Sequence, residues 1–109
     1  SLEELAEICN NENILIVQAH PNRAYCEPVN PALLDGAEVF NGNPRHDSNN
    51  DKTYAWAYEH DLIMTSGSDF HEKEDLALGG IITEYDIKTE NDLIQTLLSG
   101  DYSLITPVE

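Results

Sequence analysis

Metal-ligand side chains follow an apolar run in the second half of this 109-residue chain. Asp69 and His71 come after the run 62–65 and are two positions apart, so in an extended backbone both side chains project to the same side. One carboxylate oxygen and one imidazole nitrogen suit zinc, manganese or iron. The small residues at 66–68 let a ligand approach the backbone. The pattern predicts a metal site, although a helix-capping Asp69 and a surface His71 would explain the same string.

A third candidate ligand follows an earlier apolar run. The continuous run 14–17 predicts a strand buried on both faces, as in a parallel sheet, and Pro21 must end it. His20 therefore lies at the carboxyl end of this strand. Because such ends share one edge of a parallel sheet, we expect His20 beside Asp69 and His71. Taken alone, His20 is more typical of a structural hydrogen bond.

Polar residues accompany the strand expected at 37–40. Glu38 lies within it and Asn41 follows it. An unpaired carboxylate inside a buried strand is costly. Glu38 therefore either pairs with Arg23 or points at the cluster of strand ends, and the sequence leaves both alternatives open.

The elements that must position these residues follow from apolar periodicity and turn residues, and they predict an α/β fold with mostly parallel pairing. Ser1 begins a helix with a capping box, and Thr89 caps a later helix that Gly100 stops. The acidic residues Asp69, Glu72, Glu74 and Asp75 are typical of a solvated loop, and Trp56 is predicted as a packing residue. We find no internal repeat or linker, so residues 1–109 are expected to form a single unit. The remaining predictions are strands at 14–17, 37–40, 62–65, 79–83 and 102–106, a helical turn at 31–34, and a helix from Asn49 or Asn50 to about His60.

Composition excludes several classes of protein. The chain has 21 acidic and 5 basic residues and a formal net charge of −16, which argues against direct nucleic-acid binding. No apolar run approaches the roughly 20 residues of a membrane span, and a complete β/α barrel needs about 250 residues. Cys9 and Cys26 fit no zinc spacing and indicate a reducing, cytoplasmic setting, although a disulfide between them stays open.

Four motifs together resemble the later motifs of the PHP (polymerase and histidinol phosphatase) family. The resemblance runs from His20 to about Gly80 and implies a distorted β/α barrel with a metal cluster that hydrolyses phosphoesters. The family's opening His-x-His pair, further early histidines and bridging glutamate have no counterpart in this sequence. The chain is therefore similar to the C-terminal part of a PHP domain, an incomplete barrel. The motifs are His20-Pro21-Asn22-Arg23, the segment 35–42, Asn50 with Ala57, and the segment 65–71.

The resemblance implies roles for six residues. His20, Asp69 and His71 correspond to metal ligands, the last two serving different ions. The remaining three correspond to positions near the substrate pocket, with an arginine as the direct phosphate contact because its fork matches the oxygens. These substrate-binding residues are Arg23, Asn41 and Asn50.

The implied activity is metal-dependent phosphoester hydrolysis by a full-length parent protein. Its cofactors would be divalent zinc, manganese or iron, in a cluster that this chain leaves incomplete, so the chain alone is expected to be inactive. The substrate would be a phosphorylated small molecule or nucleotide. A sugar phosphate, histidinol phosphate and an oligonucleotide end all remain open.

The missing ligands also favour a function of another class. The chain would then be a non-catalytic acidic α/β module for interaction or assembly. An incomplete barrel exposes strand edges and apolar sheet faces, which favour self-association. On this alternative we expect a homo-oligomer, most simply a dimer.

Overall fold

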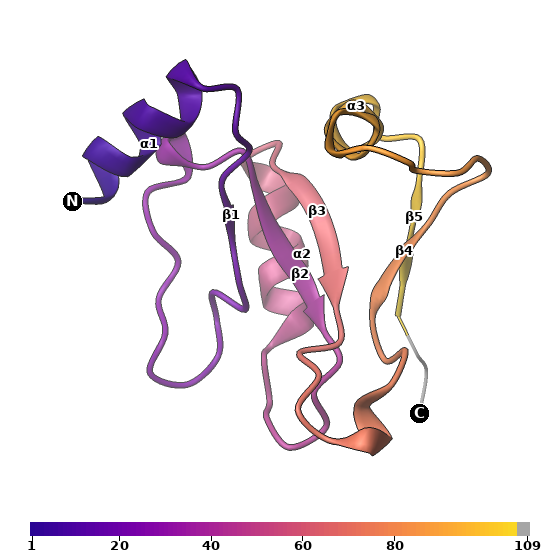
Figure 1. Cartoon of the computed structure of the whole chain (residues 1–109). Coiled ribbons are helices and arrows are strands. Elements are labelled where there is room, and N and C mark those ends of the chain that lie inside the picture. Colours follow the sequence, from indigo (N-terminus) through magenta and orange to yellow (C-terminus); the bar gives the residue numbers. More distant parts are fainter. Residues whose placement is uncertain (107–109) are drawn as a thin grey trace.

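The computed structural model describes residues 1–106 of the chain (Figure 1). The fold is mixed α/β, and its elements follow the predicted order. No helix in this part of the chain is long and apolar enough to cross a membrane. The elements are α1 (Leu2–Asn11), β1 (Val17–Gln18), a 3-10 turn (Pro31–Leu33), β2 (Gly36–Asn41), α2 (Asn50–Glu59), β3 (Ile63–Gly67), a second 3-10 turn (Lys73–Asp75), β4 (Gly80–Ile82), α3 (Glu90–Ser99) and β5 (Ser103–Ile105).

The strands form two separate sheets. β1, β2 and β3 are parallel and lie in that order, with β2 in the centre. β4 and β5 form an antiparallel pair beyond β3 (Figure 1). The predicted mostly parallel pairing is therefore confirmed for the first three strands, and the last two strands add an antiparallel pair. Residues 1–106 form no closed barrel.

The first predicted strand is mostly absent. Only Val17 of the apolar run 14–17 belongs to β1, and the strand continues to Gln18. The prediction of burial on both faces is wrong, because Ile14 is 52% and Val17 is 37% exposed. β1 pairs only with β2 within the described residues, so it is an edge strand.

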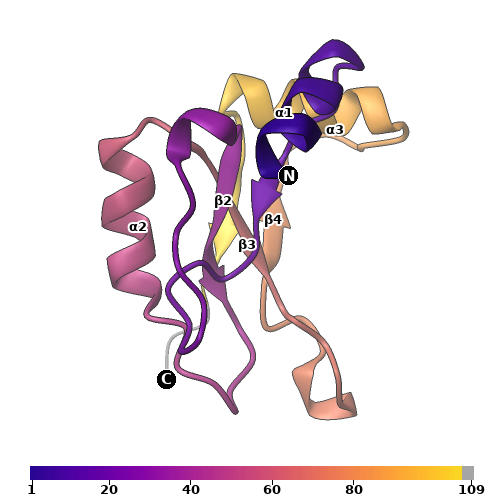
Figure 2. The ribbon, with the colours of Figure 1, turned by 90° about the vertical axis from the view of Figure 1, so that its left-hand side faces the viewer.

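The core lies between the parallel sheet and α2, which covers one face of that sheet (Figure 2). Ala37 and Val39 of β2 pack with Ala57 of α2, and each of these side chains is at most 2% exposed. Trp56 packs against this cluster, which confirms its predicted role. Small side chains on the facing elements let the helix lie close to the strands and fix the ends of β2 and α2 relative to one another.

Helix ends follow the predicted capping chemistry in two of three cases. The Ser1 hydroxyl accepts from the Glu4 N–H at 3.2 Å. The return contact of the predicted capping box is not formed, because Glu4 Oε1 lies 3.9 Å from the Ser1 nitrogen. The Thr89 side chain likewise caps α3, and Gly100 ends it with a left-handed φ of 75°. Asn49 precedes α2 as expected, but its side chain makes no cap and instead donates to the Asn22 carbonyl at 2.8 Å. That contact ties the start of α2 to the loop after β1.

Candidate functional site

The carboxyl ends of β1, β2 and β3 bring predicted site residues to one edge of the sheet. Glu38 Oε1 accepts from the backbone N–H of His20 at 3.1 Å and from Asn41 Nδ2 at 2.8 Å. The same Asn41 nitrogen lies 3.4 Å from Asp69 Oδ2. One carboxylate and one amide therefore connect all three strand ends. Of the two alternatives left open for Glu38, the structure selects the one that points at this cluster.

Arg23 lies among the same groups. Its Nη2 donates to Asp69 Oδ2 at 2.8 Å and to Asn41 Oδ1 at 2.9 Å. Ser48 Oγ accepts from both Nη2 and Nε of Arg23. The Arg23 and Asp69 side chains are only 13% and 19% exposed. The hydrogen bond from Arg23, supported by the one from Asn41 and opposed by burial, lowers the pKa of Asp69 and keeps its carboxylate ionised.

The ring of His71 contacts the backbone of its own loop. Its Nδ1 lies 2.7 Å from the backbone carbonyl oxygen of Asp69. A carbonyl oxygen only accepts, so Nδ1 is the donor in this contact, and in a neutral ring Nε2 then holds the lone pair. The His71 side chain is 66% exposed. This arrangement is typical of a histidine that presents Nε2 to a metal ion or acts as a base.

Two of the predicted ligand residues have unusual backbone conformations. His20 has φ 25° and Asp69 has φ 50°. Such left-handed angles cost free energy for residues other than glycine, and they persist only where neighbouring contacts hold them. Glu38 holds His20, and Arg23 with Asn41 holds Asp69. Strain at both strand ends fits a site that depends on their placement.

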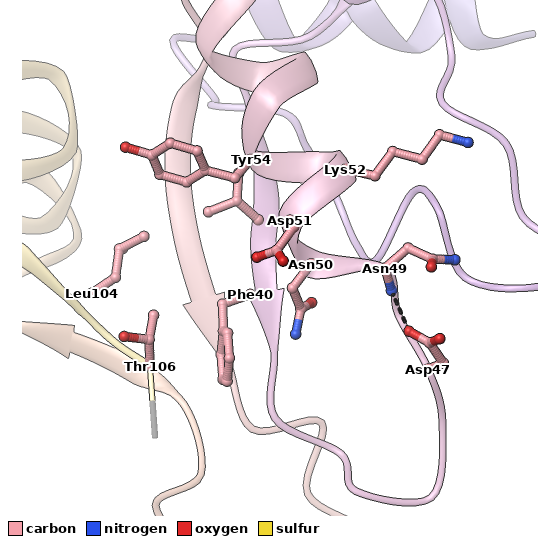
Figure 3. A pocket seen from close by; sticks show the side chains of 10 residues that line it. Phe40, Asp47, Asn49, Asn50, Asp51, Lys52, Tyr54, Leu104 and Thr106 are labelled. Carbon is pink, nitrogen blue, oxygen red and sulfur yellow. Dashed lines mark hydrogen bonds between the residues drawn. The ribbon is translucent and has the colours of Figure 1, made fainter. Parts of the chain in front are cut away.

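Asn50 acts through the backbone of Asn41. Its Oδ1 accepts from the Asn41 N–H at 3.0 Å, and its Nδ2 donates to the Asn41 carbonyl at 3.3 Å. The Asn50 side chain thus joins the start of α2 to the end of β2. Asn50 also lines a groove between β2, α2 and β5, together with Phe40, Tyr54 and Leu104 (Figure 3). Asn50 is the one predicted site residue among the described residues lining that groove.

Sequence reasoning missed three residues near this edge. The predicted solvated loop is wrong for Asp75, which is fully buried and paired with Arg45. Asn43 is 4% exposed, and its Nδ2 donates to the Asp69 carbonyl at 3.3 Å. The one available signal was the alternation of Asn41, Asn43 and Arg45, which begins at the last residue of β2 and places polar side chains at every second position.

The donor atoms suit a divalent metal in type but not in number. Asp69 offers a carboxylate and His71 an imidazole, which zinc, manganese and iron accept. Within residues 1–106, however, no three His, Cys, Asp or Glu side chains gather closely enough to hold an ion. His20 Nδ1 lies 3.7 Å from Cys26 Sγ, and Asp69 Oδ2 is bound by Arg23. A metal site at this edge therefore needs further ligands from outside the described residues.

A comparison with protein families gave one match. The sequence model of a family described as PHP-associated matches residues 47–102, slightly more than half of the chain. The matched segment contains α2, β3, Asp69 and His71, whereas His20 and Arg23 lie outside it. No curated protein and no solved structure matched the chain.

Proposed function

The chain belongs to the PHP-associated family, and on this premise we propose that it forms the later part of a metal-dependent phosphoesterase. One observation carries the proposal. Three parallel strand ends hold Asp69, His71 and Arg23 at one edge of the sheet, connected through Glu38 and Asn41. Carboxylate, imidazole and guanidinium groups at such an edge suit the hydrolysis of a phosphoester.

On this proposal the parallel sheet is an arc of an incomplete, distorted β/α barrel. α2 covers its outer face, as a barrel helix does. The accessible surface of the chain is 7423 Å², whereas a compact monomer of this mass exposes about 6,100 Å². The excess is consistent with surface that further strands and helices would cover.

Asp69 Oδ1, His71 Nε2 and the His20 imidazole would be this chain's contribution to a cluster of zinc, manganese or iron. The metal would supply a bound water of lowered pKa and would stabilise charge on the phosphate oxygens. Arg23 keeps Asp69 ionised through Nη2. Its Nη1 has no hydrogen-bond partner within residues 1–106 and is the group we assign to a phosphate oxygen. Asn41 holds both Arg23 and Asp69 in place, and Asn50 holds Asn41.

The substrate is proposed to be a phosphorylated small molecule or nucleotide. A net charge of −16 repels phosphate unless cations intervene, which agrees with a metal-dependent reaction. Cys9 and Cys26 are both free thiols, in keeping with a cytoplasmic setting.

Two measurements on the full-length parent test the proposal: zinc titration by calorimetry, and hydrolysis of an aryl phosphate with manganese. Asp69→Ala should abolish hydrolysis and weaken zinc binding by at least about tenfold, since it removes a ligand. His46→Gln is the matched control, because His46 is exposed and its side chain makes no hydrogen bond within the described residues. Unchanged hydrolysis in the Asp69→Ala parent would contradict the proposal.

A second candidate function is the non-catalytic assembly module, and the exposed apolar surface of α1 and β1 supports it. Leu5 and Ile8 on α1 are 48% and 58% exposed, and Ile14 and Val17 nearby are 52% and 37% exposed. Exposed apolar side chains and an edge strand favour association. Light scattering should then detect a homo-oligomer, most simply a dimer, that Val17→Lys disrupts. A monomer at all concentrations would count against this function.

A further inference from the structure

A buried ion pair lies beside the proposed site. Asp75, at the end of the second 3-10 turn, has a side chain that is 0% exposed. It accepts from both terminal nitrogens of Arg45, with Nη1 at 3.0 Å from Oδ1. Its Oδ2 also accepts from the backbone N–H groups of His71 at 2.9 Å and Glu72 at 3.0 Å. The Arg45 hydrogen bond, followed by that of His71, lowers the pKa of Asp75 and keeps the buried carboxylate ionised.

This pair joins the loop after β2 to the loop after β3. The two loops approach each other closely at glycines. A Cβ on Gly42 would overlap the Leu78 carbonyl, and a Cβ on Gly79 would overlap Gly67. The Gly42 N–H donates to the Gly67 carbonyl at 2.8 Å. The loop after β3 is thereby held against the end of β2, with the ion pair as its charged contact.

His71 is held from both sides by this arrangement. Its backbone N–H is bound by Asp75, and its ring Nδ1 contacts the Asp69 carbonyl. Asn43 donates to that same carbonyl, and its Oδ1 accepts from the Arg45 N–H at 3.0 Å. Asp75 therefore binds the backbone of His71 directly. Arg45 is connected through Asn43 to the Asp69 carbonyl that contacts the His71 ring.

We propose that Arg45 and Asp75 are positioning residues that fix the ring of His71, with Nδ1 protonated and Nε2 presented to a ligand. The His71 side chain is 66% exposed, so solvent competes for its ring and the tautomer depends on how firmly the Asp69 carbonyl is held. The identity of the ligand rests on the proposed function. The tautomer itself does not, because it is a property of the chain without metal or substrate.

Nitrogen-15 NMR of the histidine rings in the whole chain tests this proposal. Spectra are recorded at about pH 8.5, and a His71→Gln spectrum identifies the His71 signals. Wild type should show the Nδ1–H form of His71. Asp75→Asn and Arg45→Gln should convert most of the population to the Nε2–H form, and Arg45→Lys should retain most of the Nδ1–H form. Glu74→Gln is the matched control, since it removes an exposed carboxylate from the same turn.

A persistent Nδ1–H form in folded Asp75→Asn or Arg45→Gln would overturn the proposal, as would an equal change in Glu74→Gln. If Asp75→Asn does not fold, Arg45→Gln decides the matter, because Arg45 is 39% exposed. Hydrolysis of an aryl phosphate with manganese by the full-length parent tests the proposed function separately. Hydrolysis that is unchanged in the Asp69→Ala parent would contradict that function, whereas the tautomers alone decide the positioning role.

Discussion

Two Arg–Asp pairs flank the end of the parallel sheet, and they differ in which partner is buried. In the first pair the Arg23 and Asp69 side chains are 13% and 19% exposed. In the second, Arg45 is 39% exposed while Asp75 is 0% exposed. Asp75 Oδ2 accepts from one arginine and two backbone N–H groups, whereas Asp69 Oδ1 faces His71 Nδ1 at 3.4 Å.

The same type of ion pair can therefore hold a loop in place or leave a carboxylate available to a ligand. A fully buried carboxylate is stable only if all of its hydrogen-bonding capacity is used, so Asp75 has none left for a ligand. Asp69 is ionised, partly exposed and keeps one oxygen without a strong donor among the described residues. The first pair therefore suits ligand binding, and the second suits the placement of a loop.

The largest expected effect is on stability, in Asp75→Asn. The amide would place an N–H group against other donors in a buried site. We expect a fall in Tm of about 10 °C or more, measured by circular dichroism at pH 7. Asp69→Asn is the matched variant in the first pair and should lower Tm by less than half as much. Equal losses in the two variants would remove the distinction between the pairs.

An intermediate effect is expected on acid stability. The pKa values of Asp69 and Asp75 lie below the usual value in the folded state, so both pairs stabilise the protein above the unfolded Asp pKa of about 3.9. This contribution is lost as the pH falls through the folded pKa values. The difference in Tm between wild type and Asp75→Asn should therefore be full at pH 7 and smaller at about pH 3. A difference that grows on acidification would contradict the assignment.

The smallest effects are expected at the neighbours of the two arginines. Ser48 is 3% exposed and accepts from Arg23, so Ser48→Ala should cost about 1 kcal/mol by removing a buried acceptor. Glu72 is 60% exposed and pairs with Arg45, so Glu72→Gln should change the free energy of unfolding very little. Urea denaturation of both variants measures the difference. A larger loss of stability in Glu72→Gln than in Ser48→Ala would show that the Arg45–Asp75 pair depends on the exposed Glu72.

The fold was predictable where it depends on neighbouring residues. The caps at Ser1 and Thr89 and the stop at Gly100 act within one helical turn, and the structure confirms all three. The extent of β1 was not predictable. A strand forms only where a partner offers hydrogen bonds, and β1 finds that partner in β2, 19 residues further along, for just Val17 and Gln18.

The sequence by itself determined the order of the elements and the placement of His20, Asp69 and His71 at strand ends, because both follow from local periodicity. Only the tertiary structure decided that Glu38 points at the strand ends and that Asp75 is buried with Arg45. The partners in these contacts come from different strands and loops, 30 residues apart in the case of Arg45 and Asp75. Whether a charged side chain is buried depends on these tertiary contacts, and it cannot be predicted from the residue type alone.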